Sequence, residues 1–362
     1  MNYGNCTYIS WDKYEESPEI QIANGDILLV KTGSSFGKCA YVCDLPQEAT
    51  INPQFVVLKY ILCNPRFLTY ILQSGYARRN YDEFVLGTAI PTFTQVVLGD
   101  MYIPLPPIQE QQRIVNAIKQ WFALIDTLEI AKEDLQTSIA QTKSKILDLA
   151  IHGKLVPQDP DDEPAIELLK RINPKFTPCD NAHDTNQLPN SWCWATLGDV
   201  CELVTGSTPS KLHPEYYGGD FPFYKPSDLD AGRHVSIPSE FLTDAGKGVS
   251  RIIPVGATAI CCIGSIGKCG FIEKEGTTNQ QINTAVPSNS LYPLYLYYFC
   301  NSSYFIDELS ADSSAITISI VNKSKLSKML ISLPPYKEQL RIVAKIEELF
   351  AVLDEIQKSI EA

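Results

Sequence analysis

The chain of 362 residues is too long for one compact domain and fits two or three, since domains usually run about 100 to 200 residues. Its 44% hydrophobic, 20% charged and 10% aromatic residues predict sizeable cores, which excludes a disordered, collagen-like or low-complexity chain. The net charge of −12 argues against a protein that grips nucleic acid by its own electrostatic attraction.

Residues 1–107 are predicted to form a β-rich mixed module. The apolar run Asp26–Lys31 lies between glycines, as buried strands often do, and the glycine-rich stretch 33–38 is predicted to be a turn that closes a hairpin. Residues 55–73 are aromatic and leucine-rich without internal glycine, which predicts a helix packed beside the strands. Ser35 and Lys38 satisfy an SxxK pattern, but the glycine between them weakens the helix that would present a catalytic serine, so a hydrolase is a remote alternative.

Residues 108–152 are predicted to form one long coiled-coil helix. Pro106 and Pro107 fix an extended approach and a first helical turn, apolar residues then recur at alternating steps of three and four, and Gly153 ends the pattern. A run of about 43 residues rises roughly 65 Å at 1.5 Å per residue. Its apolar stripe must face another long helix.

The rest of the chain is predicted to contain a connection, a second module and a second coiled-coil helix. Residues 153–188 hold a short helix that Pro164 starts, followed by a polar linker. Residues 189–333 form the second module, with a buried strand at Ala257–Ile263, and residues 334–362 form the second long helix.

An internal repeat relates the two halves. Residues 103–129 align without gaps to residues 331–357, 228 positions later, and 13 of the 27 positions are identical. Weaker echoes precede each copy, GSSFGKC at 33–39 against GSIGKC at 264–269 and NPQF at 52–55 against NQQI at 279–282. The first half lacks a counterpart of residues 188–228, so its front part is predicted to be missing.

Several chemical classes are excluded by the pattern of residues. The four histidines lie far apart and no Cys/His spacing matches a zinc module, so we expect neither a metal site nor catalytic residues. The best membrane candidate, residues 252–272, is broken by four glycines and Lys268. Eleven cysteines without a CxxC pair, and a start without a charged segment followed by an apolar one, predict a cytoplasmic protein.

The motif LPP(I/Y)xEQxRIV at the start of a long helix, its repetition 228 residues later, and AIHGKLVPQDPDDEPAIELLKRI together resemble the specificity subunit of type I restriction-modification systems. The resemblance covers nearly the whole chain. It implies an α+β fold with two β-rich mixed target recognition domains separated by long antiparallel coiled-coil helices. Such a subunit is not an enzyme.

The resemblance also implies partners. We expect recognition of a bipartite target in double-stranded DNA and docking of methyltransferase and restriction subunits, with S-adenosylmethionine and ATP on those partners and no cofactor on this chain. If partner subunits hold the chain on DNA, the chain itself needs only contacts that distinguish bases. An acidic net charge is therefore compatible with DNA recognition.

Two departures from the family pattern leave an alternative open. The front of the first module is missing, and the second helix stops 27 residues after Pro335, whereas the first runs 45 residues from Pro107 to His152. The alternative is a truncated or rearranged specificity-like assembly protein that binds methyltransferase subunits or dimerises but reads only a half-site. The uncovered apolar stripe predicts recruitment of a second copy, or of another helix, through the long helices.

Candidate DNA contacts are polar or cationic residues in loops, because Lys and Ser meet phosphates and Arg meets base edges. Solvated surface is the alternative for each, and Lys38 and Lys268 equally suit a structural turn. The candidates are Lys31, Ser34, Lys38, Arg78 and Arg79 in the first half, and Thr208, Lys211, Lys225, Arg233, Lys247 and Lys268 in the second.

Overall fold

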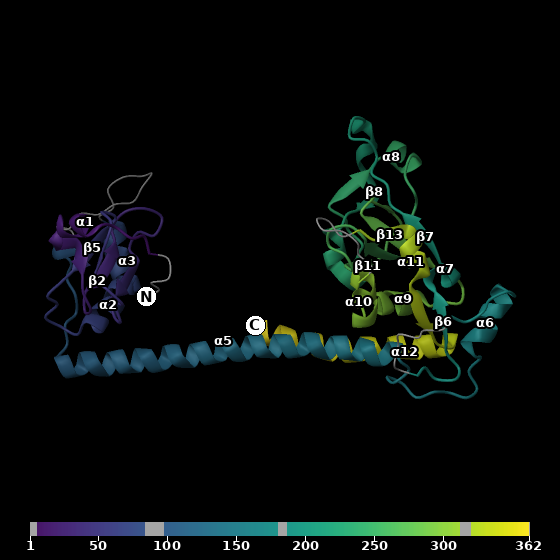
Figure 1. Ribbon diagram of the computed structural model, residues 1–362, viewed down its shortest axis with the longest axis horizontal. Coiled ribbons are helices and arrows are strands. Elements are labelled where there is room, and N and C mark those ends of the chain that lie inside the picture. Colours follow the sequence, from purple (N-terminus) through teal and green to yellow (C-terminus); the bar gives the residue numbers. More distant parts are fainter. Residues whose placement is uncertain (1–5, 84–97, 180–186, 312–319, 362) are drawn as a thin grey trace. The chain divides into compact units, whose positions relative to one another are not determined.

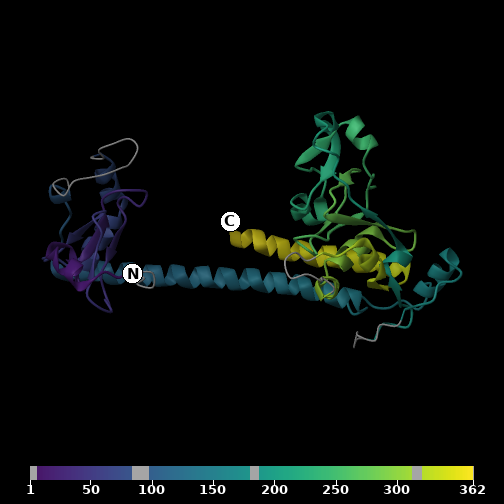
Figure 2. The ribbon, with the colours of Figure 1, turned by 45° about the horizontal axis from the view of Figure 1, so that its top comes forward.

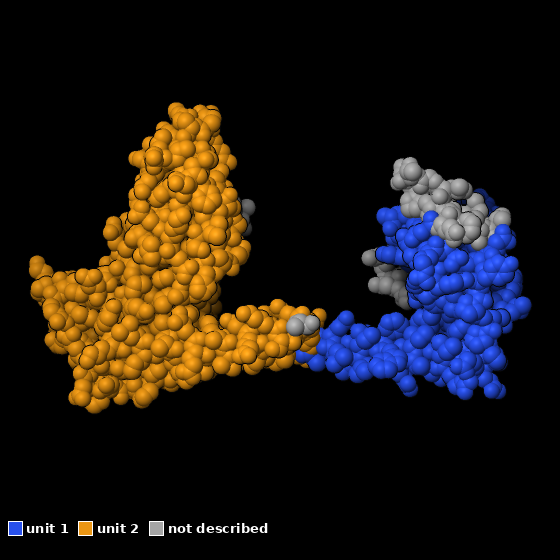
Figure 3. Space-filling model, turned by 180° about the vertical axis from the view of Figure 1, so that it is seen from behind, with its two compact units in different colours: residues 1–131 blue, residues 132–362 orange. Residues whose placement is uncertain are grey.

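The computed structural model describes residues 6–83, 98–179, 187–311 and 320–361 (Figure 1). The chain forms two compact units, residues 1–131 and residues 132–362, which Figure 3 colours separately. Each is described by itself below. Within the described residues, no helix is long and apolar enough to cross a membrane.

Unit 1 is built around a small antiparallel sheet with strand order β3-β2-β5. Helix α2 packs against this sheet and buries Phe67, Leu68 and Leu72, while α3 follows directly after it. The strands of unit 1 are β1 (Gln21–Ile22), β2 (Ile27–Val30), β3 (Cys39–Tyr41), β4 (Ala49–Thr50) and β5 (Phe55–Leu58). Its helices before α5 are α1 (Trp11–Glu15), η1 (Pro18–Ile20), α2 (Pro65–Gln73) and α3 (Gly75–Glu83).

The predicted helix over residues 55–73 is wrong in its first part. Phe55–Leu58 is the strand β5, paired antiparallel with β2, and only Pro65–Gln73 is helical. Asn64 caps this helix by accepting hydrogen bonds from the backbone N–H groups of Arg66 and Phe67. A short apolar run such as FVVL fits a buried strand as well as a helix, and pairing with β2 decides between them.

Helix α5 is one continuous element from Ile108 to Ile151, as the proline pair and the apolar stripe predict. It begins in unit 1 and ends in unit 2. Gly153 follows with a positive φ of 68°, and the N–H of Lys154 bonds the carbonyl of Leu149. This left-handed residue ends the helix.

The described residues of unit 2 form three sheets, with strand orders β11-β10-β13-β7, β12-β8-β9 and β14-β6. Its strands are β6 (Cys193–Thr196), β7 (Cys201–Thr205), β8 (Tyr217–Tyr224), β9 (Glu240–Leu242), β10 (Thr258–Cys261), β11 (Cys269–Phe271), β12 (Thr277–Thr278), β13 (Ile282–Pro287) and β14 (Leu330–Leu333). Its further helices are α6 (Ala165–Ile172), α7 (Leu197–Val200), η2 (Pro214–Tyr216), η3 (Asp228–His234), α8 (Asp244–Gly248), α9 (Pro293–Cys300), α10 (Ser303–Ala311), α11 (Lys323–Lys328) and α12 (Tyr336–Glu361).

Helix α12 lies antiparallel beside the C-terminal part of α5 within unit 2 (Figures 1 and 2). Ile342, Val343 and Ile346 share one buried cluster with Ile146 and Leu147 of α5. The predicted pairing of two long helices is therefore confirmed. Together with the three sheets it gives the mixed α+β fold that the sequence predicts.

Candidate nucleic-acid interface

Two hairpin turns repeat in the two units and carry equivalent lysines. The turn between β2 and β3 holds Lys38, and the turn between β10 and β11 holds Lys268. In each turn the second glycine has a positive φ, 77° at Gly37 and 83° at Gly267, and donates its N–H back to the preceding strand. The predicted glycine turns are confirmed. Ser35 and Lys38 lie in the first turn, and Ser265 and Lys268 repeat the SxxK spacing in the second, so neither serine is presented from a helix.

Most candidate cations of unit 2 are already paired with carboxylates. Lys225 bonds Glu240 at 2.7 Å and Lys268 bonds Asp230 at 2.5 Å. Lys247 bonds Glu275 at 3.2 Å, so a binding phosphate would have to compete with a carboxylate at each of these positions.

Lys225 and Lys247 also lie over aromatic rings of β8. Their ammonium groups are 5.8 Å from the ring centre of Phe223 and 4.4 Å from that of Phe221. Phe221 and Phe223 are two positions apart and face the same side of the strand. The β8–β9 sheet and α8 form the end of unit 2 that lies away from α12 (Figures 1 and 2). That end therefore presents lysines and carboxylates, while the two rings beneath the lysines are buried.

Arg233 is engaged on several sides at once. Its guanidinium bonds Glu273 at 3.2 Å and Glu347 of α12 at 3.4 Å, and lies 4.6 Å from the ring centre of Phe271. Those contacts connect η3 to α12. This setting favours a structural role for Arg233 over a direct contact with DNA.

In unit 1, Arg78 is likewise held in place. It donates to the carbonyl of Phe36 at 2.9 Å and pairs with Asp82. The neighbouring Arg79 is exposed and, within the described part of the chain, forms no ion pair.

The remaining candidates are open to a ligand to different degrees. Ser34, Lys38, Thr208 and Lys211 are exposed, Lys31 is half-buried, and Thr208 bonds the side chain of Gln280. Lys31, Lys38 and Lys211 take part in no ion pair among the residues that the structure describes. The structure thus leaves Lys38, Arg79 and Lys211 as the cations best placed to meet a phosphate.

A pair of buried glutamines, which sequence reasoning missed, fastens each module to its long helix. In unit 1 the side-chain oxygen of Gln111 accepts from the N–H of Asn64 at 2.8 Å, and its nitrogen donates to the carbonyl of Pro106 at 2.7 Å. Asn64 and Pro106 respectively precede α2 and the long helix α5. One amide therefore joins the two helix starts.

Gln339 repeats these bonds in unit 2. Its oxygen accepts from the N–H of Tyr292 at 2.6 Å, and its nitrogen donates to the carbonyls of Pro334 and Ser290. Tyr292 and Pro334 lie 228 positions after Asn64 and Pro106, the offset of the sequence repeat. The Glu-Gln pair that is identical in both repeats was the sequence signal for this glutamine. The identity does not show which backbone groups the side chain bonds.

Glu338 next to this glutamine is a buried carboxylate. It accepts from the indole N–H of Trp192 at 3.0 Å and from the amide of Gln158 at 2.7 Å. Burial raises the pKa of Glu338, and the two donors oppose that rise. The equivalent Glu110 in unit 1 pairs with Arg113 on the surface. Glu338 therefore binds the start of the second module to α12.

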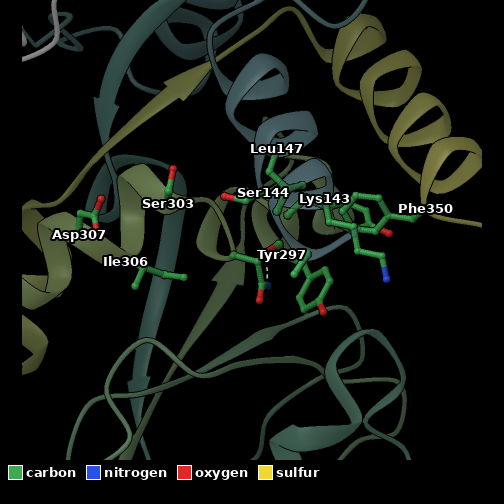
Figure 4. A pocket seen from close by; sticks show the side chains of 11 residues that line it. Lys143, Ser144, Leu147, Tyr297, Ser303, Ile306, Asp307 and Phe350 are labelled. Carbon is green, nitrogen blue, oxygen red and sulfur yellow. Dashed lines mark hydrogen bonds between the residues drawn. The ribbon is translucent and has the colours of Figure 1, made fainter. Parts of the chain in front are cut away.

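An open pocket of about 470 Å³ lies where α5, α9, α10 and α12 meet in unit 2 (Figure 4). Lys143 and Phe350 line one end of it, and Ile306 and Asp307 the other. The ammonium group of Lys143 also bonds Asp354 at 2.5 Å. Within the described residues, no three His, Cys, Asp or Glu side chains converge as metal ligands.

Residues 3–137 and 189–362 match the family described as type I restriction modification DNA specificity domain. Similar proteins include the type I restriction enzyme HindI specificity subunit of Haemophilus influenzae, 23% identical, with 90% of this chain and 80% of the relative covered. The EcoAI specificity subunit of Escherichia coli is 25% identical over 92% of this chain and 69% of its own.

Two solved structures share the fold. One comes from work on complex assembly and conformational transition of the type I R-M system, with a TM-score of 0.65, 22% identity and coverage of 94% of this chain and 78% of that one. The other is the HsdS subunit from Thermoanaerobacter tengcongensis, with a TM-score of 0.56, 21% identity and coverage of 93% and 76%.

Proposed function

Because the chain belongs to the family of type I restriction modification DNA specificity subunits, we propose that it recognises a bipartite target in double-stranded DNA, one half with each module. The observation that carries this proposal is the duplicated attachment. Gln111 and Gln339 join equivalent modules to equivalent helix starts. Two similar reading modules on long helices suit a divided target, because half-site spacing follows from how far apart the readers are held.

Both modules offer cations at equivalent places for this task. Lys38 in unit 1 and Lys268 in unit 2 occupy the repeated hairpin turn, and Lys211 lies exposed in unit 2. Lys38 and Lys211 position the chain on phosphates, Lys268 does so only in competition with Asp230, and polar side chains such as Thr208 and Gln280 are suited to base edges. With a net charge of −12, the chain depends on partners for affinity.

The partners that fit are methyltransferase and restriction subunits, which carry S-adenosylmethionine and ATP. The apolar residues Trp121, Phe122 and Leu128 of α5 are 66%, 52% and 62% exposed, which supports docking of a methyltransferase subunit or a second copy on this helix. The chain itself supplies recognition and leaves the chemistry to the enzyme subunits.

The test is to co-express the chain with its methyltransferase subunit and to sequence the methylated sites of the host genome. We expect one motif made of two short specified parts separated by a fixed number of unspecified bases. An undivided motif, or no methylation by a complex that assembles normally, would contradict the proposal.

A second candidate is an assembly protein that reads only a half-site. It is favoured because, in the described part of unit 1, no strands equivalent to β6, β7 and β8 are present. The same experiment separates the two functions, since a half-reader methylates sites with one specified part and no constraint at a distance.

A further inference from the structure

Each unit contains its own core sheet, and the two sheets have the same topology but differ at their edges. Strands β3-β2-β5 of unit 1 correspond to β11-β10-β13 of unit 2, with the same antiparallel pairing. In unit 2, β7 continues this sheet beyond β13, and β6 pairs with β14. Both added strands belong to one segment, Cys193–Thr205, in which α7 joins them. Among the described residues of unit 1, no strand covers either edge.

The first open edge is the outer side of β5. The N–H of Lys31 bonds the carbonyl of Gln54, so residues 54, 56 and 58 face β2 and residues 55, 57 and 59 face outward. Their equivalents in β13 are 227 positions later, at 282, 284 and 286. There the carbonyl of Ile282 accepts from the N–H of Gly206, directly after β7. The outward groups of β5 are thus those that a strand like β7 would bond.

The second open edge is residues 102–105, the counterpart of β14 at an offset of 228. Tyr102 and Leu105 are 89% and 61% exposed. Pro104 in this segment lacks an N–H, but it corresponds to Ser332, which lies opposite Trp194. The carbonyl of Trp194 accepts from Cys179 on its other side, so this pair exchanges no ladder bonds and a proline is tolerated there.

An apolar groove of about 370 Å³ lies between these two edges. It is lined by Leu58, Leu62, Leu68, Ile103 and Leu105, among others, and Leu62 is fully exposed. In unit 2 the connection between the two added strands is α7, whose Leu197 and Val200 are fully buried in the core. The groove therefore offers apolar surface where the equivalent unit buries two aliphatic side chains.

We propose that unit 1 binds, by strand addition at both edges, a strand–helix–strand segment with the chemistry of Cys193–Thr205 that is supplied from outside these 362 residues. Charge supports this occupant. In unit 2, Glu202 of β7 lies opposite Val286, and the equivalent of Val286 in unit 1 is Lys59. A bound segment would place its glutamate across from this lysine, an opposite-charge pair between neighbouring strands.

A second copy of the chain is a poor source of the segment. Ala195, Leu197 and Val200 are fully buried within unit 2, so releasing them would expose its core. The occupant is accordingly a segment of this chemistry that is not already packed into a complete unit. This inference concerns binding of a peptide segment and holds whether or not the chain reads DNA.

The experiment uses the full chain and a fluorescent synthetic peptide of residues 189–206, with both cysteines replaced by serine, and measures binding by anisotropy. We expect saturable binding with one peptide per chain. Leu105→Asp in the groove weakens it at least tenfold. Leu124→Asp, a change at an exposed leucine of α5 outside the groove, leaves it unchanged.

A charge exchange tests the register of the added strand. Lys59→Glu weakens binding about threefold, within the range expected for one cross-strand charge pair, and a peptide carrying Glu202→Lys restores it. Absence of binding, or binding indifferent to Leu105→Asp and to the charge exchange, overturns the proposal. Dimerisation of the peptide-free chain that Leu105→Asp abolishes would identify a second copy as the occupant and overturn the assignment to a free segment.

Discussion

Gln111 and Gln339 each satisfy buried backbone groups with both ends of one amide. Gln111 is 3% exposed and Gln339 is fully buried, so water is not available to replace their bonds. Each amide holds the start of a module helix against the start of a long helix. The repeated glutamine is therefore a positioning residue, because it fixes how each module leaves its helix.

The change Gln111→Leu should lower the local stability of unit 1 at the start of α2. The leucine leaves the N–H of Asn64 and the carbonyl of Pro106 without partners, at a cost of about 1 to 3 kcal/mol for each buried group. Hydrogen exchange of the full chain should show faster exchange in residues 64–73. Gln120 of the same helix is exposed, so Gln120→Leu is the matched control. Equal exchange in both variants would contradict the positioning role.

For single residues, the sequence shows that a position is important more readily than it shows which contacts the side chain makes. The identity of EQ in both repeats marks Gln339, but its bonds to Tyr292 and Pro334 depend on three-dimensional neighbours. For the DNA candidates the residue type suggested a role, but the sequence did not show their neighbours. Arg233 and Lys225 have a residue type suited to phosphates, yet they lie beside carboxylates that are distant in sequence. Only folding reveals those partners.

Helices α5 and α12 follow their apolar stripes closely, because a stripe of steps three and four fits only one secondary structure. The short run at Phe55–Leu58 carries no such information, and it forms a strand because β2 lies beside it. Coverage differs between the two helices. Phe350 of α12 packs on the core of unit 2, whereas the equivalent Phe122 of α5 is 52% exposed.

The change Ile346→Ala should destabilise unit 2 by about 2 to 5 kcal/mol, because it removes fully buried methyl groups between α12 and the core. Val352→Ala on the same helix, where the side chain is 54% exposed, should change stability by less than about 1 kcal/mol. Urea unfolding followed by tryptophan fluorescence measures both, in a chain in which Trp11 and Trp121 of unit 1 are replaced by phenylalanine so that Trp192 and Trp194 report on unit 2. Equal effects of the two changes would mean that α12 does not pack on unit 2 in solution.

At the scale of the whole molecule, acidity and recognition are compatible if affinity comes from partners. The net charge is −12, and the described structure pairs Lys225, Lys247 and Lys268 with carboxylates. Such a chain favours contacts that discriminate bases over contacts that attract the phosphate backbone. In the function proposed above, the arrangement of the two modules matters more than the strength of either, and that arrangement would depend on α5, which begins in one unit and ends in the other.

Lengthening α5 should therefore change the spacing of the DNA target. Seven residues inserted between Glu129 and Ile130 add about 10.5 Å of helix, or roughly three base pairs at about 3.4 Å each. The insertion turns one end by only about 20° relative to the other, because seven residues nearly complete two turns. It precedes Lys143, Ile146 and Leu147, which pack on α12, so that pairing is kept.

The measurement is the methylated motif of the complex formed with the lengthened chain. Both specified parts should be unchanged, and the unspecified gap between them should grow by about three base pairs. An insertion of seven residues between Thr177 and Pro178, which are exposed in the connection after α6, is the control, since it lengthens a loop of unit 2 only. An unchanged gap with the lengthened helix would mean that contacts other than α5 hold the two modules apart.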